Sequence, residues 1–329
     1  MTHAPDRYDR MFYRRCGRSG LRLPLISLGF WQSLGEAGRE DLCRKVMARA
    51  IDLGITHFDF ANNYGPPPGS AEEIAGKLLK DFPRDELVIS TKAGFEMWPG
   101  PYGSGGSRKY LISSLDASLK RLRLDYVDIF YHHCHDPNTP MEESLGALDH
   151  IVKQGKALYI GVSNYNGAQF QQACEIIRAN NFTRLLIVQP HMNMLERTHI
   201  GGLLPHTDRE GVGAIPFCPL AQGALTDRYR HGIPPDSRRG RLGEDGVKWY
   251  EEREANGTWA KVEKLAAIAE RRGQTLAQMA LVWLLRDCRV SSVLIGASRV
   301  HQLEENVASL EKMHFEDNEL GEIWGILTS

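Results

Sequence analysis

HFDFANNYG, residues 57–65, is the stretch that decides the fold prediction. It begins with apolar residues that alternate around an acid, a pattern typical of a β-strand, and it breaks at the two asparagines. PPPG (66–69) follows, which neither a strand nor a helix can continue. Asp59 therefore ends a strand and Tyr64 opens a loop. Taken alone, the pattern also fits a buried acid that holds a turn under a packed tyrosine.

Strand and helix patterns alternate along the whole chain. Strands are expected at 26–30, within 57–65, and at 87–92, 126–133, 157–163, 185–189, 212–216 and 292–295. Helices are expected at 39–53, from 70, and at 111–122, 141–154, 168–179, 202–210, 258–271, 276–286 and 300–310. A hairpin (12–25) precedes them, and an irregular polar segment (222–256) follows the seventh strand.

This order predicts an α/β protein, a single (β/α)8 TIM barrel of residues 1–329. An N-terminal β-hairpin and extra loops and helices after strand seven complete it. The alternative is a doubly wound sheet, which normally has a glycine-rich turn after its first strand. LGFW (28–31) does not fit the pattern G-x-G-x-x-G, so the barrel is favoured.

The composition narrows the class of protein. With 329 residues, 42% hydrophobic and 25% charged, the chain can bury a large core. The net charge of -1 gives no electrostatic basis for binding nucleic acid, and no apolar run approaches the roughly 18 residues of a spanning helix. Scattered cysteines and an N-terminus without an apolar core are typical of a cytosolic protein. We therefore expect a cytoplasmic protein that binds neither nucleic acid nor a membrane.

Polar residues at the carboxyl ends of the predicted strands are the candidates for a site, because active sites of TIM barrels lie at that edge. Asp59 and Tyr64 come from strand two and its loop. Lys92 ends strand three and His133 ends strand four. An ammonium that faces a barrel interior is costly unless a carboxylate neutralises it, and Asp59 is the expected partner. A structural ion pair is the alternative.

These four residue types fit a site for proton transfer. A tyrosine beside an ammonium is expected to have a lowered pKa and to donate a proton near neutral pH. Lys92 would tune Tyr64, and Asp59 would hold Lys92. His133 would bind and orient a carbonyl oxygen. None of the four residues is placed to attack a substrate carbon as a nucleophile. The expected reaction is therefore reduction of a carbonyl by hydride from a nicotinamide.

The motif DFANNYG (59–65), with a lysine ending the next strand and a histidine ending the fourth, resembles the aldo-keto reductase superfamily over essentially the whole chain. Segments 62–73 and 97–110 are similar to bacterial members that reduce a phosphorylated three-carbon aldehyde. DPNTP (136–140) is shared with the related potassium-channel β subunits. Cys134 stands where close relatives usually have arginine. The resemblance implies a catalytic tetrad of Asp59, Tyr64, Lys92 and His133.

The same resemblance implies an NADPH site. Ser163, Asn164 and Gln189 would contact the carboxamide, and Phe217 would contact the nicotinamide ring. The contacts implied along the phosphates are Pro219, Leu220, Gln222, Gly223, Arg228 and Arg238. Those implied on the adenosine side are Gly296, Ser298, Arg299, Gln302, Glu305 and Asn306, and Trp31 and Asp59 complete the cofactor contacts. GASR (296–299) opens a helix, where backbone amides and a guanidinium suit a 2′-phosphate. For Arg228 and Arg238, solvated loop charge is the alternative.

Substrate contacts are expected from Trp31, Tyr64, Trp98 and Arg108, with Arg108 meeting a substrate phosphate. A solvated loop is the alternative for Trp98 and Arg108. HHCH (132–135) suggests a metal cluster, but successive side chains on a strand point to opposite faces, so no metal is expected.

The expected function is NADPH-dependent reduction of small aldehydes, such as L-glyceraldehyde 3-phosphate or methylglyoxal, with Tyr64 as the general acid. The alternative is an NADP(H)-binding regulatory partner that resembles a potassium-channel β subunit. In that group an asparagine commonly replaces the tetrad histidine, so His133 favours catalysis. The family's known assemblies imply a homo-tetramer or homo-octamer.

Overall fold

Eight parallel strands form one sheet in the computed structural model, which describes residues 3–32 and 34–329. Along the chain the strands are β3 (Ile26–Gly29), β4 (His57–Asp59), β5 (Val88–Ala93), β6 (Val127–His132), β7 (Ala157–Ser163), β8 (Leu185–Gln189), β9 (Gly213–Ala214) and β10 (Val293–Ile295). Their spatial order is β10-β3-β4-β5-β6-β7-β8-β9.

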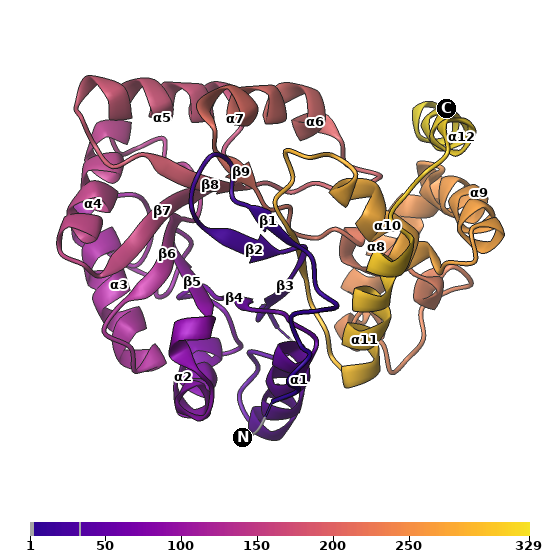
Figure 1. The fold of residues 1–329 in the computed structure, drawn as a ribbon, viewed down its shortest axis with the longest axis horizontal. Coiled ribbons are helices and arrows are strands. Elements are labelled where there is room, and N and C mark those ends of the chain that lie inside the picture. Colours follow the sequence, from indigo (N-terminus) through magenta and orange to yellow (C-terminus); the bar gives the residue numbers. More distant parts are fainter. Residues whose placement is uncertain (1–2, 33) are drawn as a thin grey trace.

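The sheet closes on itself between its last two strands. Ser291 N donates to the Ala214 carbonyl oxygen (2.8 Å), and Leu294 N donates to the Pro216 carbonyl oxygen (3.0 Å). The strands therefore follow one another around a ring, with helices outside them (Figure 1). This arrangement confirms the predicted (β/α)8 barrel, because a doubly wound sheet reverses its strand order and stays open.

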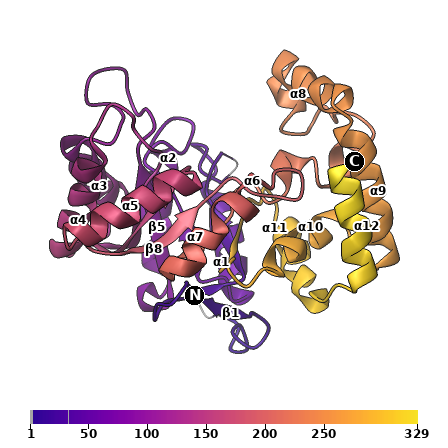
Figure 2. The same ribbon diagram turned by 90° about the horizontal axis from the view of Figure 1, so that it is seen from above.

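The helices cover the barrel and extend it on one side. They are α1 (Glu40–Asp52), α2 (Ser70–Leu78), α3 (Arg108–Leu122), α4 (Met141–Lys153), α5 (Gly167–Ala179), α6 (Thr198–Gly202), α7 (Leu204–Glu210), α8 (Glu244–Ala255), α9 (Thr258–Arg271), α10 (Leu276–Leu285), α11 (Val300–Ala308) and α12 (Asp317–Thr328). Helices α8, α9 and α12 lie together beside the barrel (Figure 2). Within the described residues, no helix has both the length and the apolar character that crossing a membrane requires.

Helices α8 and α12 differ from the expected pattern. The segment 222–256 was expected to be irregular, but its second half forms α8, and α12 follows the last expected helix. Only Gly246 and Trp249 of α8 are buried, and only Ile323 and Leu327 of α12. With so few buried side chains, neither segment carries the apolar period of a core-facing helix.

One smaller expectation was also wrong, because the helix expected at 202–210 is split into α6 and α7. Helix α2 begins at Ser70, as expected, and its N-cap is Gly69 with φ 93°. The Ser70 hydroxyl donates to the Gly35 carbonyl oxygen, so it ties α2 to the loop after β3.

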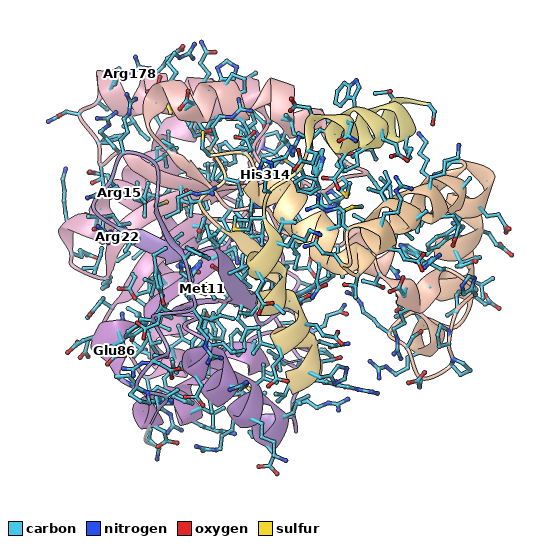
Figure 3. The ribbon with its side chains drawn as sticks, turned by 45° about the vertical axis from the view of Figure 1, so that its right-hand side comes forward. Met11, Arg15, Arg22, Glu86, Arg178 and His314 are labelled. Atoms are coloured by element: carbon cyan, nitrogen blue, oxygen red, sulfur yellow. The ribbon has the colours of Figure 1, made fainter. Side chains whose placement is uncertain are left out.

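The expected hairpin is formed by β1 (Tyr13–Arg15) and β2 (Arg22–Pro24), and it plugs the amino end of the barrel. Its Cys16 and Leu23 are fully buried. They belong to one buried cluster with side chains of the barrel strands and their ends, Val88, Ile129, Tyr131, Leu186, Ile187, Ile215 and Leu294. Figure 3 marks Arg15 and Arg22, which oppose each other in the hairpin and are exposed. The opposite edge of the barrel is left for a site.

Gly76 fixes the contact between α2 and α3. A Cβ at this position would lie 2.0 Å from the Arg121 carbonyl oxygen, a backbone atom that cannot rotate away. We expect Gly76→Ala to destabilise the fold by about 1–3 kcal/mol, since the two helices must move apart. Urea unfolding measures the change. Gly321→Ala, in α12 with no atom within 4 Å of the added Cβ, is the control. It should gain about 0.5–1 kcal/mol, and equal behaviour of both variants would contradict the packing argument.

Candidate active site

Neighbouring strands bring the predicted tetrad together at the carboxyl edge of the barrel. Asp59 is the last residue of β4, Lys92 is the penultimate residue of β5, and His133 follows β6. Tyr64 comes from the loop between β4 and α2, and its carbonyl oxygen accepts from Gly69 N (3.1 Å) where that helix begins. Since parallel strands share a direction, the four side chains meet at one edge.

The Lys92 ammonium is fully buried and is surrounded by oxygen acceptors. It donates to the Asp59 carboxylate, to the Phe60 carbonyl oxygen (2.7 Å) and to the Tyr64 hydroxyl oxygen (3.3 Å). These acceptors match the three hydrogens of an ammonium and offset the cost of burying its charge. Because the Tyr64 oxygen accepts from Lys92, its own proton is free to point elsewhere.

The Asp59 carboxylate is also fully buried, and each of its oxygens has partners. Oδ2 pairs with Lys92. Oδ1 accepts from the Ser90 hydroxyl (2.6 Å) and from the Gln189 amide nitrogen (3.3 Å). The carboxylate is therefore held by side chains of two other strands, β5 and β8, which fixes the direction in which it presents Oδ2 to the ammonium.

His133 lies beside Tyr64 at the same mouth. The two ring centroids are 5.9 Å apart, and the Phe95 ring packs edge-on against His133 at 4.6 Å. The Asn164 amide nitrogen donates to the His133 carbonyl oxygen (2.9 Å) and anchors its backbone. A carbonyl oxygen placed between the two rings would be within reach of a phenol and an imidazole N–H.

Burial decides the protonation of these two rings. It raises the pKa of Tyr64 well above 10, and the charge of Asp59 adds to the rise. The sequence-based expectation of a lowered pKa was therefore wrong, because burial of the phenol, with the Asp59 charge beside it, determines the direction of the shift. Burial and the Lys92 charge lower the pKa of His133 well below 6.5. At neutral pH Tyr64 keeps its proton, and His133 is uncharged.

Aromatic side chains at the barrel mouth are exposed. Trp31, Phe95, Trp98 and Tyr102 are 42–54% exposed, and all lie in loops that follow β3 or β5. Aromatic side chains that are exposed at this edge of the barrel can line a pocket for a small molecule. Of these, Phe95 packs its ring directly on His133 of the tetrad.

The residues expected to hold the carboxamide form a connected rim. The Asn164 amide nitrogen donates to the Ser163 hydroxyl (3.1 Å), which itself donates to the Gln189 carbonyl oxygen (2.9 Å). Asn164 has φ +56°, a conformation uncommon outside glycine. Phe217 follows β9 and stacks on His191 with centroids 5.2 Å apart. The rim and this ring come from successive strands next to His133.

The loop after Phe217 has an unusual backbone. Cys218, Ala221 and Gln222 have positive φ values of 53°, 49° and 59°, which are costly for residues with a Cβ. A Cβ on Gly223 would lie 2.5 Å from the Tyr229 ring, so the loop also requires this glycine. Such backbone strain clusters at ligand sites, and here it covers the segment expected along the phosphates, Pro219, Leu220, Gln222 and Gly223.

Two guanidinium groups lie close to this loop. Arg238 lies over the Trp31 ring, 4.5 Å from its centroid, and links two of the predicted cofactor residues. Arg239, which is 8% exposed, donates to Gln222 and lies over Trp249 at 4.2 Å. Burial and the Arg238 charge lower the pKa of Arg239 to about 10. Adjacent cations with unpaired Nε atoms fit a polyanion such as a pyrophosphate.

The other predicted basic residues meet at an exposed acid. Arg228 forms a 2.9 Å ion pair with Asp236, and Arg299 lies 3.9 Å from the same carboxylate. Arg299 is the N-cap of α11, so the amino end of that helix also faces this region. Segment 227–240 therefore reaches the adenosine side of the expected site.

The remaining adenosine-side residues are placed by α11. The Gln302 side chain accepts from Ser298 N (2.9 Å) and from the Ser298 hydroxyl (3.0 Å), which closes the turn that starts at Gly296. Glu305 is exposed and Asn306 is buried on the next turn. This arrangement keeps the five residues on one short segment.

Arg108 is engaged away from the tetrad. Its guanidinium donates to the Gly146 carbonyl oxygen of α4 (3.2 Å), and its backbone N donates to Glu143 (2.9 Å). To meet a substrate phosphate, the Arg108 side chain would have to leave that carbonyl. Trp98, in contrast, packs edge-on near Tyr110 with centroids 6.5 Å apart.

The HHCH segment gathers no metal ligands. The His132 Nδ1 atom lies 2.8 Å from the Tyr165 hydroxyl, on the opposite face of β6 from the barrel interior. Nowhere in residues 3–32 and 34–329 do three or more His, Cys, Asp or Glu side chains meet as a metal site.

Phe95 and Arg239 are candidates that the sequence prediction missed. Phe95 follows β5 by two residues, so its position just past a strand end was a usable signal. Arg239 belongs to the run SRRGR (237–241), in which only Arg238 was singled out. Which of two adjacent arginines faces inward depends on the loop path, which the sequence does not reveal.

Comparisons with known proteins identify the family of the chain. A family model described as "Aldo/keto reductase family" matches residues 25–327. L-glyceraldehyde 3-phosphate reductases of Escherichia coli strains K12 and O157:H7 are each 54% identical over 323 residues, which cover 97% of this chain and 93% of theirs. A thermostable aldo-keto reductase crystallised with the inhibitor epalrestat has a TM-score of 0.76 and 28% identity, over 96% of this chain and 100% of that one.

The family match spans almost the whole barrel, and the tetrad lies where the sequence motif predicted it. Sequence, fold and site thus lead to the same assignment. The chain belongs to the aldo/keto reductase family and is a nicotinamide-dependent oxidoreductase.

Proposed function

We propose that this protein is an NADPH-dependent reductase of small aldehydes, with L-glyceraldehyde 3-phosphate as the first candidate substrate and methylglyoxal as the second. The observation that carries the proposal is the buried Lys92 ammonium between the Asp59 carboxylate and the Tyr64 hydroxyl. The two Escherichia coli relatives named for L-glyceraldehyde 3-phosphate support the choice of substrate.

In the proposed mechanism, Tyr64 is the general acid. Its protonated hydroxyl and the neutral His133 ring donate hydrogen bonds to the aldehyde oxygen and orient the carbonyl. Phe217 would hold a nicotinamide, and the chemistry that this group would supply when bound is a hydride for the carbonyl carbon. Tyr64 gives its proton to the oxygen, and the product is an alcohol. The Lys92 ammonium stabilises the phenolate that remains, and Asp59 holds Lys92 in place.

The cofactor site has donors of the type that NADPH needs. Ser163, Asn164 and Gln189 would hold the carboxamide, and the loop 218–223 with Arg238 would follow the pyrophosphate. Unpaired Nε atoms on Arg238 and Arg239 support this fit, because an anion would satisfy them. Trp31 and Trp98 would cover the substrate.

The direct test is loss of NADPH absorbance with L-glyceraldehyde 3-phosphate, methylglyoxal and an aromatic aldehyde. We expect turnover of at least one of these aldehydes. If NADPH binds tightly and none is reduced, the protein is a cofactor-binding regulatory partner of the kind that potassium-channel β subunits represent.

Arg299 is the proposed determinant of the 2′-phosphate. We expect Arg299→Ala to weaken NADPH binding about tenfold or more and to leave NADH binding within about twofold, since one charge-assisted contact is worth about 1.5–3 kcal/mol. Quenching of protein fluorescence measures both dissociation constants. Arg271→Ala, in an exposed ion pair with Glu322, is the matched control. If the affinities for NADH and NADPH fell equally, Arg299 would not be the residue that contacts the 2′-phosphate.

We also propose that residues 1–329 act as one barrel domain in the cytoplasm and assemble as a homo-tetramer or homo-octamer. The scattered cysteines support a reducing compartment, and the exposed Trp324 of α12 offers an apolar contact. Light scattering after gel filtration tests the assembly, and a monomer would contradict it.

A further inference from the structure

A continuous chain of hydrogen-bonded side chains lies inside the barrel below the buried ion pair. The Ser292 and Ser27 hydroxyls are 2.6 Å apart, and Ser27 Oγ lies 2.9 Å from His57 Nδ1. His57 Nε2 lies 3.0 Å from Ser90 Oγ, and the Ser90 hydroxyl donates to Asp59 Oδ1 at 2.6 Å. All five side chains have an exposed fraction of 0%.

Strand periodicity explains why these groups meet. His57 and Asp59 are two residues apart on β4, and Ser90 and Lys92 are two residues apart on β5, so each pair projects to one face. That face is the barrel interior, where the other residues are mostly aliphatic, as Ile129 and Leu294 show.

The hydrogen bonds of this side-chain series all run in one direction, from Ser292 to Asp59. A carboxylate only accepts hydrogen bonds, so the Ser90 hydroxyl must donate to Asp59. Ser90 Oγ then accepts from His57 Nε2–H, which leaves Nδ1 of the neutral ring as an acceptor for the Ser27 hydroxyl. Ser292 in turn donates to Ser27. Burial lowers the pKa of His57 to about 4, so the ring is neutral at pH 7 and this order holds.

A contribution to fold stability does not by itself explain why these polar side chains lie inside the barrel. Aliphatic side chains of similar volume would fill the same space without burying any polar atom, and buried polar groups contribute only when every partner is present. Here each hydroxyl and both ring nitrogens have a partner, and the whole set ends on the functional carboxylate. A complete, directed network is therefore better explained by the orientation it gives to Asp59.

We propose that Ser90 and His57 are positioning residues of the reductase, which fix Asp59 so that Lys92 faces the Tyr64 hydroxyl. This inference rests on the proposed function of the tetrad. Ser90 acts on Asp59 directly, His57 fixes the Ser90 hydroxyl, and Ser27 fixes the tautomer of His57. The chain positions groups and carries no proton to solvent, because its far end, Ser292, is fully buried.

The test compares variants that break the chain at different places. Ser90→Ala removes the donor to Asp59. His57→Asn keeps a polar atom near the Nδ1 position but loses the donor to Ser90, whereas the amide of His57→Gln can reach Ser90 and replace that donor. Ser118→Ala is the control, because it removes an equally buried hydroxyl on α3, outside the barrel. For each variant, kcat and its pH profile, the aldehyde KM and the NADPH dissociation constant are measured.

We expect Ser90→Ala and His57→Asn to lower kcat about tenfold, which corresponds to about 1.4 kcal/mol of transition-state stabilisation. The pH profile of kcat should shift, because the Asp59 charge helps to set the pKa of Tyr64 and its orientation would change. KM and the NADPH dissociation constant should stay within about twofold, and His57→Gln should recover most of kcat. Ser118→Ala should match the wild type throughout.

Two outcomes separate this inference from the proposed function. If the wild type reduces no aldehyde with NADPH, the proposed function fails. If the wild type is active and both folded variants keep its kcat and pH profile, the positioning role is overturned. Should Ser90→Ala not fold, Ser27→Ala serves instead, since it leaves the Ser90–Asp59 contact in place. It should lower kcat in the same direction by a smaller factor, and an unchanged kcat and pH profile would overturn the role.

Discussion

Tyr64→Phe is expected to lower kcat for aldehyde reduction by about 10²–10⁴-fold, the contribution typical of a positioned general acid. The substitution removes only the hydroxyl, which lies 3.3 Å from the Lys92 nitrogen, and keeps the ring that packs beside His133. The NADPH dissociation constant should change little, because the cofactor contacts come from other loops. Stopped-flow measurement of a single turnover reports the chemical step directly.

Tyr13→Phe is the matched control for loss of a phenol. The Tyr13 hydroxyl donates to the Gly54 carbonyl oxygen (2.6 Å) at the amino end of the barrel, far from the tetrad. Its loss should cost about 1 kcal/mol of stability and leave kcat unchanged. If Tyr64→Phe turned over aldehyde as fast as Tyr13→Phe, another group would have to supply the proton.

Much of the fold followed from the sequence because a parallel barrel is locally specified. The longer strands of the sheet, β5 and β8 for example, read as apolar runs that end at polar residues, and helices such as α4 have a buried stripe. The exceptions, α8 and α12, bury few side chains and pack onto other helices instead of the sheet. Helix α12 packs on α9, which is distant in the sequence, and α8 packs on its neighbour α9 through few buried side chains, so neither segment had a clear local period.

The tetrad was predictable for the same reason, since strand ends are visible in the sequence. The direction of the pKa shift of Tyr64 was not predictable from the sequence. The direction of the Tyr64 pKa depends on how much of the Lys92 charge Asp59 neutralises and on how deeply the phenol is buried, and both follow from three-dimensional packing. The same limit applies to Arg239, whose burial against Trp249 depends on the path of a long loop.

Asp59→Asn is expected to lower the free energy of unfolding by about 3–5 kcal/mol and to abolish turnover, because it leaves the buried Lys92 ammonium without a counter-charge. Lys92→Met should cost less stability, since the Asp59 carboxylate keeps its donors Ser90 and Gln189. Urea unfolding followed by tryptophan fluorescence measures both. Lys77→Met, which breaks an exposed ion pair with Glu40, is the control, with an expected cost of about 0–1 kcal/mol.

The double variant D59N/K92M and the pH dependence distinguish a charge effect from a packing effect. With both charges removed, the barrel should be more stable than with Asp59→Asn alone, because no unpaired charge stays buried. Burial already lowers the pKa of Lys92 below its usual value of 10.5, and removal of Asp59 removes the main opposing cause. The folded Asp59→Asn variant then binds fewer protons than its unfolded chain, so its stability should rise as the pH increases toward 10.5. Two results would contradict this account: a loss of unfolding free energy in Asp59→Asn that does not change with pH, or a double variant that is less stable than either single variant. Either result would mean that the loss of stability comes from packing and not from the unpaired charge.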